Sequence, residues 1–125
     1  MKMSFVTITV KNMEESIKFY TEVLRLNVLK SFSTQQGISI TFLKGDDGGM
    51  VELIEYGDNS QVQEKSRSIV SIGISVKNLD KEMKNLEELN VPIIRGPINV
   101  PSGERFLFIE DPNGVEIELI EGFEK

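Results

Sequence analysis

The chain contains no cysteine, no histidine and no tryptophan among its 125 residues. Without cysteine it forms no disulfide, and it offers neither a thiolate nucleophile nor a zinc–thiolate site. Without histidine it lacks the commonest metal ligand and the usual acid–base group near neutral pH. Mechanisms that pair a nucleophile with histidine are therefore excluded. Any catalysis must rest on carboxylates, lysine, tyrosine or a cofactor.

Positive charge and long hydrophobic runs are also scarce. The 14 Lys and Arg residues are outnumbered by 20 Asp and Glu residues, so the net charge is −6 and the pI is about 4.7. The sequence shows no dense basic face for a nucleic acid and no apolar run near the ~18 residues of a membrane span. Its start lacks the basic and then apolar pattern of an export signal. We therefore expect a cytoplasmic protein with no nucleic-acid or membrane partner.

An internal repeat organises the chain. The stretch FVTITVKNM at 5–13 resembles SIGISVKNL at 71–79, and TFLKGDDGGMVELIE at 41–55 resembles LFIEDPNGVEIELIE at 107–121. Both pairs are offset by 66 residues, and they share ten identities over 24 aligned positions. Unrelated segments of this length would share about one or two. The chain is therefore predicted to be one domain, 1–125, built from two similar modules.

Each module is predicted to fold as β-α-β-β-β, which makes the fold class α+β. Period-two alternation indicates the strands, and helical spacing after a capping asparagine, Asn12 or Asn78, indicates the helices. The turns KGDDGG and EDPNG close the last hairpin of each module. The modules are expected at 1–57 and 68–125, with a polar linker at 58–67. The expected strands are 4–10, 27–34, 38–44 and 49–56, followed by 70–76, 92–99, 104–110 and 115–121.

The first strand of each module has one apolar face and one face of small or hydroxyl residues. The apolar face suits packing against the helix. The other face carries Thr7 and Thr9 in the first module, and Ser71, Gly73 and Ser75 in the second. Side chains this small leave space above the sheet, which predicts a small-molecule pocket.

These strings resemble the vicinal-oxygen-chelate superfamily, which includes glyoxalase I, bleomycin-resistance proteins and extradiol dioxygenases. The resemblance covers nearly the whole chain and rests on VTITVKNMEESIKFYTEVLRLNV and FLFIEDPNGVEIELIE. The second string carries a DPxG turn followed by xxIELxE. The resemblance implies a glyoxalase-like fold, in which two tandem βαβββ modules form a curved, half-barrel-like mixed sheet around a cleft. It also implies a homodimer.

In metal-dependent members of that family, each module gives one His-type ligand from its first strand and one Glu from its last. Glu52 and Glu118 match the two Glu positions, whereas Phe5 and Ser71 stand at the first-strand positions. Phenylalanine cannot coordinate a metal ion, and a serine hydroxyl is a weak donor. The resemblance therefore implies the fold but only half of the metal centre.

Three interpretations of the two glutamates remain open. Glu52 and Glu118 could hold a hard cation such as Mg²⁺ or Mn²⁺ with the help of waters. One of them could be a metal-free general base that moves a proton next to a carbonyl. Both could instead supply negative potential for a cationic ligand. A purely structural alternative leaves them solvated, or paired with Arg105 or Lys44.

The expected ligand contacts are Phe5, Thr7, Ser71, Arg105 and Phe106. Phe5 is expected to form an aromatic wall, because it lies with Thr7 on the strand face away from the helix. The other strand phenylalanines are predicted to be core residues. Arg105, beside Phe106, could hold an anionic group of a substrate; the alternative is a surface ion pair.

Two functions of different class follow. The first is an isomerase or lyase of the lactoylglutathione-lyase type, in which Glu52 or Glu118 transfers the proton. The second is a non-catalytic protein that sequesters a toxic or antibiotic molecule, as bleomycin-resistance proteins do. The only cofactor considered is a divalent metal ion held weakly by the two carboxylates. Pairing of the modules within one chain or across a dimer is left open.

Overall fold

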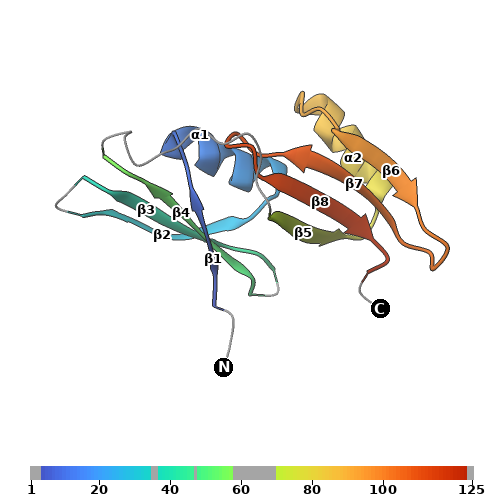
Figure 1. Cartoon of the computed structure of the whole chain (residues 1–125), viewed down its shortest axis with the longest axis horizontal. Helices are drawn as coiled ribbons and strands as arrows, with labels where there is room; N and C mark the ends of the chain where they lie inside the picture. Colours follow the sequence, from blue (N-terminus) through green and yellow to red (C-terminus); the bar gives the residue numbers. More distant parts are fainter. Residues whose placement is uncertain (1–3, 35–36, 47, 58–69, 124–125) are drawn as a thin grey trace. The chain divides into compact units, whose positions relative to one another are not determined.

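The structure, a computed structural model, describes residues 4–34, 37–46, 48–57 and 70–123. The chain divides into two compact units, Met1–Lys65 (unit 1) and Ser66–Lys125 (unit 2). The linker predicted at 58–67 lies outside the described residues. Each unit contains a four-stranded mixed sheet with its own helix (Figure 1). Within the described part of the chain, no helix is long and apolar enough to cross a membrane.

Unit 1 has the predicted order of elements. They are β1 (Val6–Thr9), α1 (Met13–Lys18), the π-helix η1 (Phe19–Val23), β2 (Asn27–Ser33), β3 (Ser39–Lys44) and β4 (Met50–Glu55). The strand order is β1-β4-β3-β2, with β1 parallel to β4 and the other neighbours antiparallel. The predicted strands are confirmed to within two residues at each end.

Unit 2 repeats this topology. Its elements are β5 (Ser71–Val76), α2 (Leu79–Glu88), β6 (Arg95–Asn99), β7 (Arg105–Glu110) and β8 (Glu116–Glu121), in the sheet order β5-β8-β7-β6. Strand β6 begins three residues later than predicted, at Arg95. The chain is still completing the end of the helix before it, because the Val91 N–H bonds back to the Leu86 carbonyl at 2.9 Å. Pro92 then lacks the N–H that a strand needs. The two tandem βαβββ modules are confirmed.

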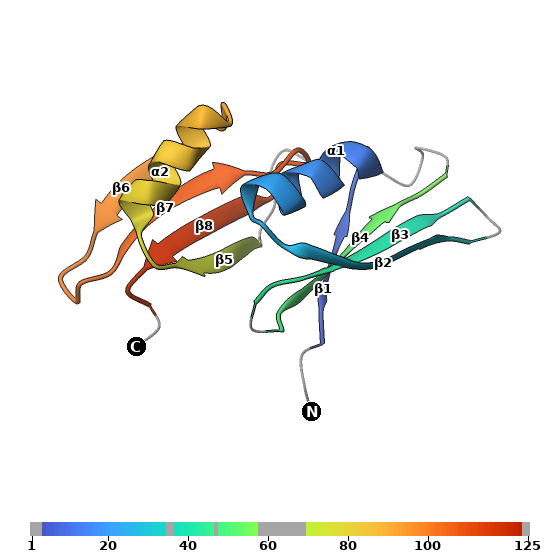
Figure 2. The ribbon, with the colours of Figure 1, turned by 180° about the vertical axis from the view of Figure 1, so that it is seen from behind.

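Each sheet buries one face under its helix, and Figure 2 shows α2 lying across the sheet of unit 2. The buried strand residues of unit 1 are Ile8, Thr41, Leu43, Val51 and Leu53, and those of unit 2 are Leu107, Ile109, Ile117 and Leu119. They alternate with more exposed residues, because successive strand side chains point to opposite faces. We call the face away from the helix the open face of each unit.

Both helices begin at the predicted asparagines. The Asn12 side chain accepts a hydrogen bond from the Glu15 N–H at 2.9 Å, and the Asn78 side chain accepts one from the Lys81 N–H at 3.0 Å. Each cap satisfies one of the N–H groups that the first helical turn leaves without a backbone partner.

A second acceptor at each helix start comes from the last strand of the same unit. Glu55 accepts a hydrogen bond from the Met13 N–H at 2.8 Å, and Glu121 accepts one from the Leu79 N–H at 2.7 Å. A carboxylate is favourable there because the N-terminus of a helix carries partial positive charge. The repeated final glutamate of each last strand therefore ties the sheet to the helix.

The first helix contains one more residue than the second. Both helical segments end at a residue in the left-handed region, Arg25 (φ 58°) or Asn90 (φ 60°). These two residues are 65 positions apart, whereas the caps Asn12 and Asn78 are 66 apart. A π-helical turn accommodates a single inserted residue within an α-helix. The π-helix η1 in unit 1 therefore absorbs the additional residue.

Candidate functional site

Glu52 and Glu118 lie on the open faces of their own units. Both are half-buried, while the residues on either side of each are buried. Because strand side chains alternate, a carboxylate between two core residues points away from the helix. The predicted orientation of both glutamates is confirmed within each unit, so neither carboxylate enters a hydrophobic core.

A row of four side chains crosses the open face of unit 1. The sheet register places Thr7, Glu52, Phe42 and Lys30 next to one another on successive strands. The Thr7 hydroxyl donates a hydrogen bond to Glu52 Oε1 at 2.6 Å. The Lys30 Nζ lies 5.3 Å from the centroid of the Phe42 ring, and the Phe5 ring packs edge-to-face on Phe42 at 5.2 Å. The face thus presents a carboxylate, two aromatic rings and a cation.

Unit 2 has a corresponding row, formed by Gly73, Glu118, Phe108 and Arg95. The Arg95 guanidinium carbon lies 4.2 Å from the centroid of Phe108, and Phe106 packs edge-to-face on Phe108 at 6.0 Å. Gly73 takes the place of the threonine, and a Cβ there would meet nothing within 4 Å. No hydrogen bond or ion pair joins the Glu118 side chain to another described residue. The Glu118 carboxylate therefore borders open space.

Sequence reasoning missed Lys30 and Arg95. They are 65 residues apart, so an offset of 66 does not align them, although each lies opposite the equivalent phenylalanine of its unit. The π-helix changes the offset to 65. An irregular pairing in β6, between Arg95 and Ile98, restores 66, because Ile98 is the equivalent of Phe32. The repeated lysine or arginine beside an aromatic strand residue was the signal in the sequence.

The prediction that Arg105 and Phe106 share a pocket face is wrong. Arg105 points to the helix side, where its guanidinium bonds Asp80 Oδ1 at 3.2 Å and Asn99 Oδ1 at 3.1 Å and lies 3.9 Å from Glu121 Oε1. The hydrogen bond and the charge of Asp80 raise the pKa of Arg105. Phe106 is the next residue in the strand and therefore faces the open side. The ion-pair alternative for Arg105 is confirmed.

The strand phenylalanines are not core residues, which corrects the prediction for all but Phe5. Phe5 and Phe32 are 46% and 47% exposed, and the others are half-buried on the open faces. Ser71 is exposed and lies opposite Glu116 in the register. Among the described residues, neither Glu52 nor Glu118 forms an ion pair with Arg105 or Lys44, so the predicted structural pairing is absent there.

The donor atoms present do not fit the metal centre of the family. At one first-strand position the Phe5 ring packs on Phe42, and at the other Ser71 offers only a hydroxyl. Hard divalent cations take about six oxygen ligands, and softer ones prefer imidazole or thiolate. The described residues contain no group of three or more acidic side chains that could hold a metal ion. The two carboxylates alone are therefore too few.

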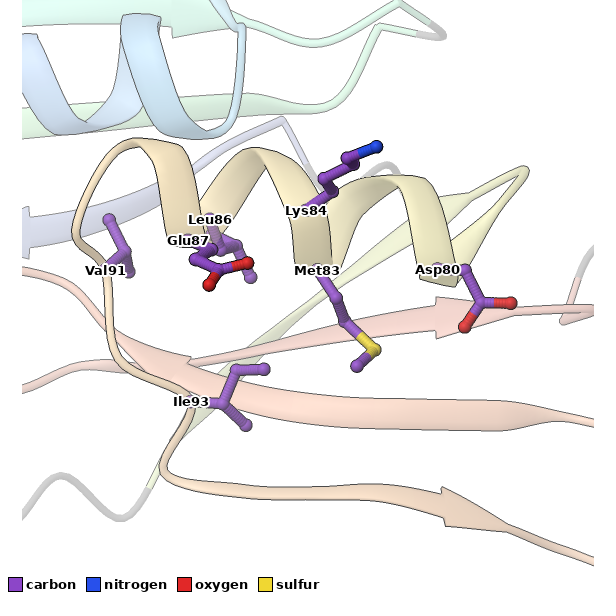
Figure 3. A pocket seen from close by; sticks show the side chains of 7 residues that line it. All are labelled: Asp80, Met83, Lys84, Leu86, Glu87, Val91 and Ile93. Atoms are coloured by element: carbon purple, nitrogen blue, oxygen red, sulfur yellow. The ribbon is translucent and has the colours of Figure 1, made fainter.

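A surface groove of about 510 Å³ lies on the helix side of unit 2. It runs between α2 and the segment that follows it, and its lining residues are Asp80, Met83, Lys84, Leu86, Glu87, Val91 and Ile93. In Figure 3, Met83 and Ile93 point toward each other across the groove, whereas Lys84 points away from it. The apolar floor and charged rim contain none of the predicted site residues.

Comparison with known sequences gives one family. The model of the Glyoxalase/Bleomycin resistance protein/Dioxygenase superfamily matches residues 2–119. An uncharacterized protein, YwbC of Bacillus subtilis, is 30% identical over 117 residues, which cover 91% of this chain and 92% of that protein. A probable lactoylglutathione lyase of Vibrio cholerae is 29% identical over 116 residues, with coverage of 90% and 84%.

Solved structures show the same fold. The fosfomycin resistance protein FosX of Listeria monocytogenes matches with a TM-score of 0.81 and 17% identity, over 98% of this chain and 94% of that one. FosX has also been solved in complex with Mn(II) and sulfate. TnmS3, an antibiotic binding protein from a Streptomyces species, matches with a TM-score of 0.76 and 19% identity, over 97% and 96% of the two chains.

Proposed function

Because the chain belongs to the Glyoxalase/Bleomycin resistance protein/Dioxygenase superfamily but lacks its metal ligands, we propose that it binds and sequesters a small organic molecule without a metal ion. The packing of Phe5 against Phe42 carries this proposal. Where a metal-dependent relative has a ligand atom, this chain has an aromatic ring that contacts a second ring beside Glu52. Aromatic surface next to one carboxylate suits an organic ligand.

Burial supports the same conclusion. Phe5 is 46% exposed, although a phenylalanine gains free energy when it leaves water. A bound apolar molecule would cover it together with the edge of Phe42. The similarity to an antibiotic binding protein is consistent with this function, but at 19% identity it supports only the fold.

Ligand screening of the metal-free protein tests the proposal. We expect fragments with an aromatic or heteroaromatic ring to bind the full chain after dialysis against EDTA, and added Mn²⁺ or Ni²⁺ to leave affinity unchanged. Phe5→Ala should weaken binding by about tenfold, because it removes one aromatic wall. Phe123→Ala is the matched control, since Phe123 is 61% exposed and lies outside the site. Binding that requires a metal ion would refute the proposal.

A second candidate is a metal-free isomerase in which Glu118 transfers the proton. The space beside Gly73 favours it, because a substrate could approach the unpaired carboxylate there. Assay of hemithioacetal isomerisation after EDTA treatment tests it. Activity lost in Glu118→Gln and kept in Glu88→Gln, an exposed helix residue, would establish catalysis and sink pure sequestration. A homodimer in the cytoplasm remains part of the proposal, and light scattering on the full chain tests the dimer.

A further inference from the structure

The two open faces neutralise their aromatic-bound cation differently. In unit 2, Arg95 donates to both carboxylate oxygens of Glu116, at 2.9 and 3.3 Å, and the Glu116 side chain is only 14% exposed. Hydrogen bonding and charge from Glu116 raise the pKa of Arg95. A bidentate guanidinium–carboxylate pair is a strong, directional contact. Unit 2 therefore supplies a carboxylate of its own to the cation over Phe108.

Unit 1 lacks that carboxylate. The residue of β4 equivalent to Glu116 is Met50, 66 positions earlier and likewise two residues before the open-face glutamate. Lys30 is exposed, and no described carboxylate forms an ion pair with it. Its Nζ is positioned by the Phe42 ring alone. The pseudo-symmetry thus leaves a cation without its anion on unit 1, above a half-buried thioether.

A second charge on the same face has only a neutral partner. The Glu52 carboxylate accepts a hydrogen bond from the Thr7 hydroxyl, and no lysine or arginine of the described residues pairs with it. Lys30 and Glu52 lie on β2 and β4, with Phe42 on β3 between them. Adjacent strands are about 4.8 Å apart, so the two backbones are separated by roughly 10 Å. Opposite charges at this spacing flank an aromatic surface.

We propose that the open face of unit 1 binds a small zwitterion, with a carboxylate on Lys30, an amine on Glu52 and an apolar body against Phe5, Phe42 and Met50. This inference rests on the proposed function and names its ligand class. In unit 2 the Glu116 carboxylate occupies the place that the ligand's carboxylate takes in unit 1. The charges of such a ligand complement both partners, and its apolar body covers exposed aromatic surface.

Three small probes test the charge assignment by calorimetry and NMR on the full chain. They are 4-(aminomethyl)benzoate, which carries both charges, 4-methylbenzoate, which carries only the carboxylate, and benzylamine, which carries only the amine. We expect the zwitterion to bind tightest. Lys30→Met should weaken binding of the two carboxylates by about tenfold and leave benzylamine unchanged, because a charge-assisted hydrogen bond is lost. Lys18→Met, an exposed lysine of α1, is the matched control.

Met50→Glu is the sharper variant, because it installs in unit 1 the carboxylate that unit 2 already has. We expect it to weaken both carboxylate probes as much as Lys30→Met does, while the unfolding temperature stays within a few degrees of the unmodified protein. Equal affinity of the probes, or no effect of either variant, would overturn the inference. If Phe5→Ala weakened screened ligands while Lys30→Met did not, metal-free binding would stand and the zwitterion would fall. Failure of all three probes to bind would also overturn it.

Discussion

The carboxylate of Glu55 gives the sharpest stability prediction. It accepts a hydrogen bond from the Met13 N–H at 2.8 Å, in the first turn of α1. Hydrogen bonds to charged groups contribute about 1.5–3 kcal/mol, and a charge at a helix N-terminus contributes about 0.3–1 kcal/mol. Because Glu55 is half-exposed, we expect the lower end. Glu55→Ala should cost about 1.5–2 kcal/mol, and Glu55→Gln, which keeps an acceptor, about 0.5–1 kcal/mol.

Tyrosine fluorescence during urea unfolding measures this cost in the correct unit. The chain has no tryptophan, and both of its tyrosines, Tyr20 and Tyr56, belong to unit 1. Tyr20 is fully buried beneath the sheet, so its emission reports the loss of that core. Circular dichroism follows both units together. A shift in the fluorescence midpoint therefore assigns the destabilisation to unit 1.

Glu22→Gln is the matched control for Glu55. Glu22 is an exposed carboxylate in η1, toward the C-terminal end of the helical segment, where negative charge is unfavourable. Neutralising it should leave stability unchanged or raise it by a few tenths of a kcal/mol. If Glu55→Ala changed the free energy of unfolding by less than about 0.3 kcal/mol, the carboxylate would not cap the helix. Equal costs for Glu55→Ala and Glu55→Gln would refute the role of the acceptor atom.

Three further outcomes are expected from the same unfolding measurements. Leu53→Ala, at a fully buried position, should cost about 3–5 kcal/mol, whereas Leu29→Ala, at a 51% exposed position, should cost under about 1 kcal/mol. Asp111→Ala should cost about 2–3 kcal/mol, because this buried carboxylate accepts two backbone N–H bonds at 2.8 Å in its turn. Thr7→Val should change stability by less than about 1 kcal/mol, because its bond to Glu52 is exposed; a larger loss would make this pair a structural element.

Strand parity explains why most of the open face could be predicted. In the string VELIE, Glu52 lies between two core residues and must point away from the helix, which the structure confirms. The same rule places Phe42 outward, because it lies between the buried Thr41 and Leu43. The expectation that aromatic strand residues are core was given more weight than the alternation, and it was wrong. Parity also separates Arg105 from Phe106, which are adjacent in one strand.

Contacts between distant elements could not be read from the pattern in the same way. The bond from the Met13 N–H to Glu55 joins residues 42 positions apart and depends on where β4 ends beneath α1. The repeat did carry a trace of it, because Asn12 and Glu55 both recur 66 residues later. A residue identical in both modules at a strand end, where parity gives no role, is a candidate for such a contact.

The extra residue in the first helix explains how Lys30 keeps its place. A one-residue shift within a strand turns every side chain to the opposite face. Had the insertion passed directly into β2, Lys30 would point toward α1 and would lie away from Phe42. The π-helix absorbs it before the strand begins, and unit 2 gains its own additional residue only after Arg95, in the irregular part of β6. The cation–aromatic pair is thus the same in both units although the spacing of the sequence is not. That the offset departs from 66 only between these two irregularities is what a requirement for the cation on the open face predicts.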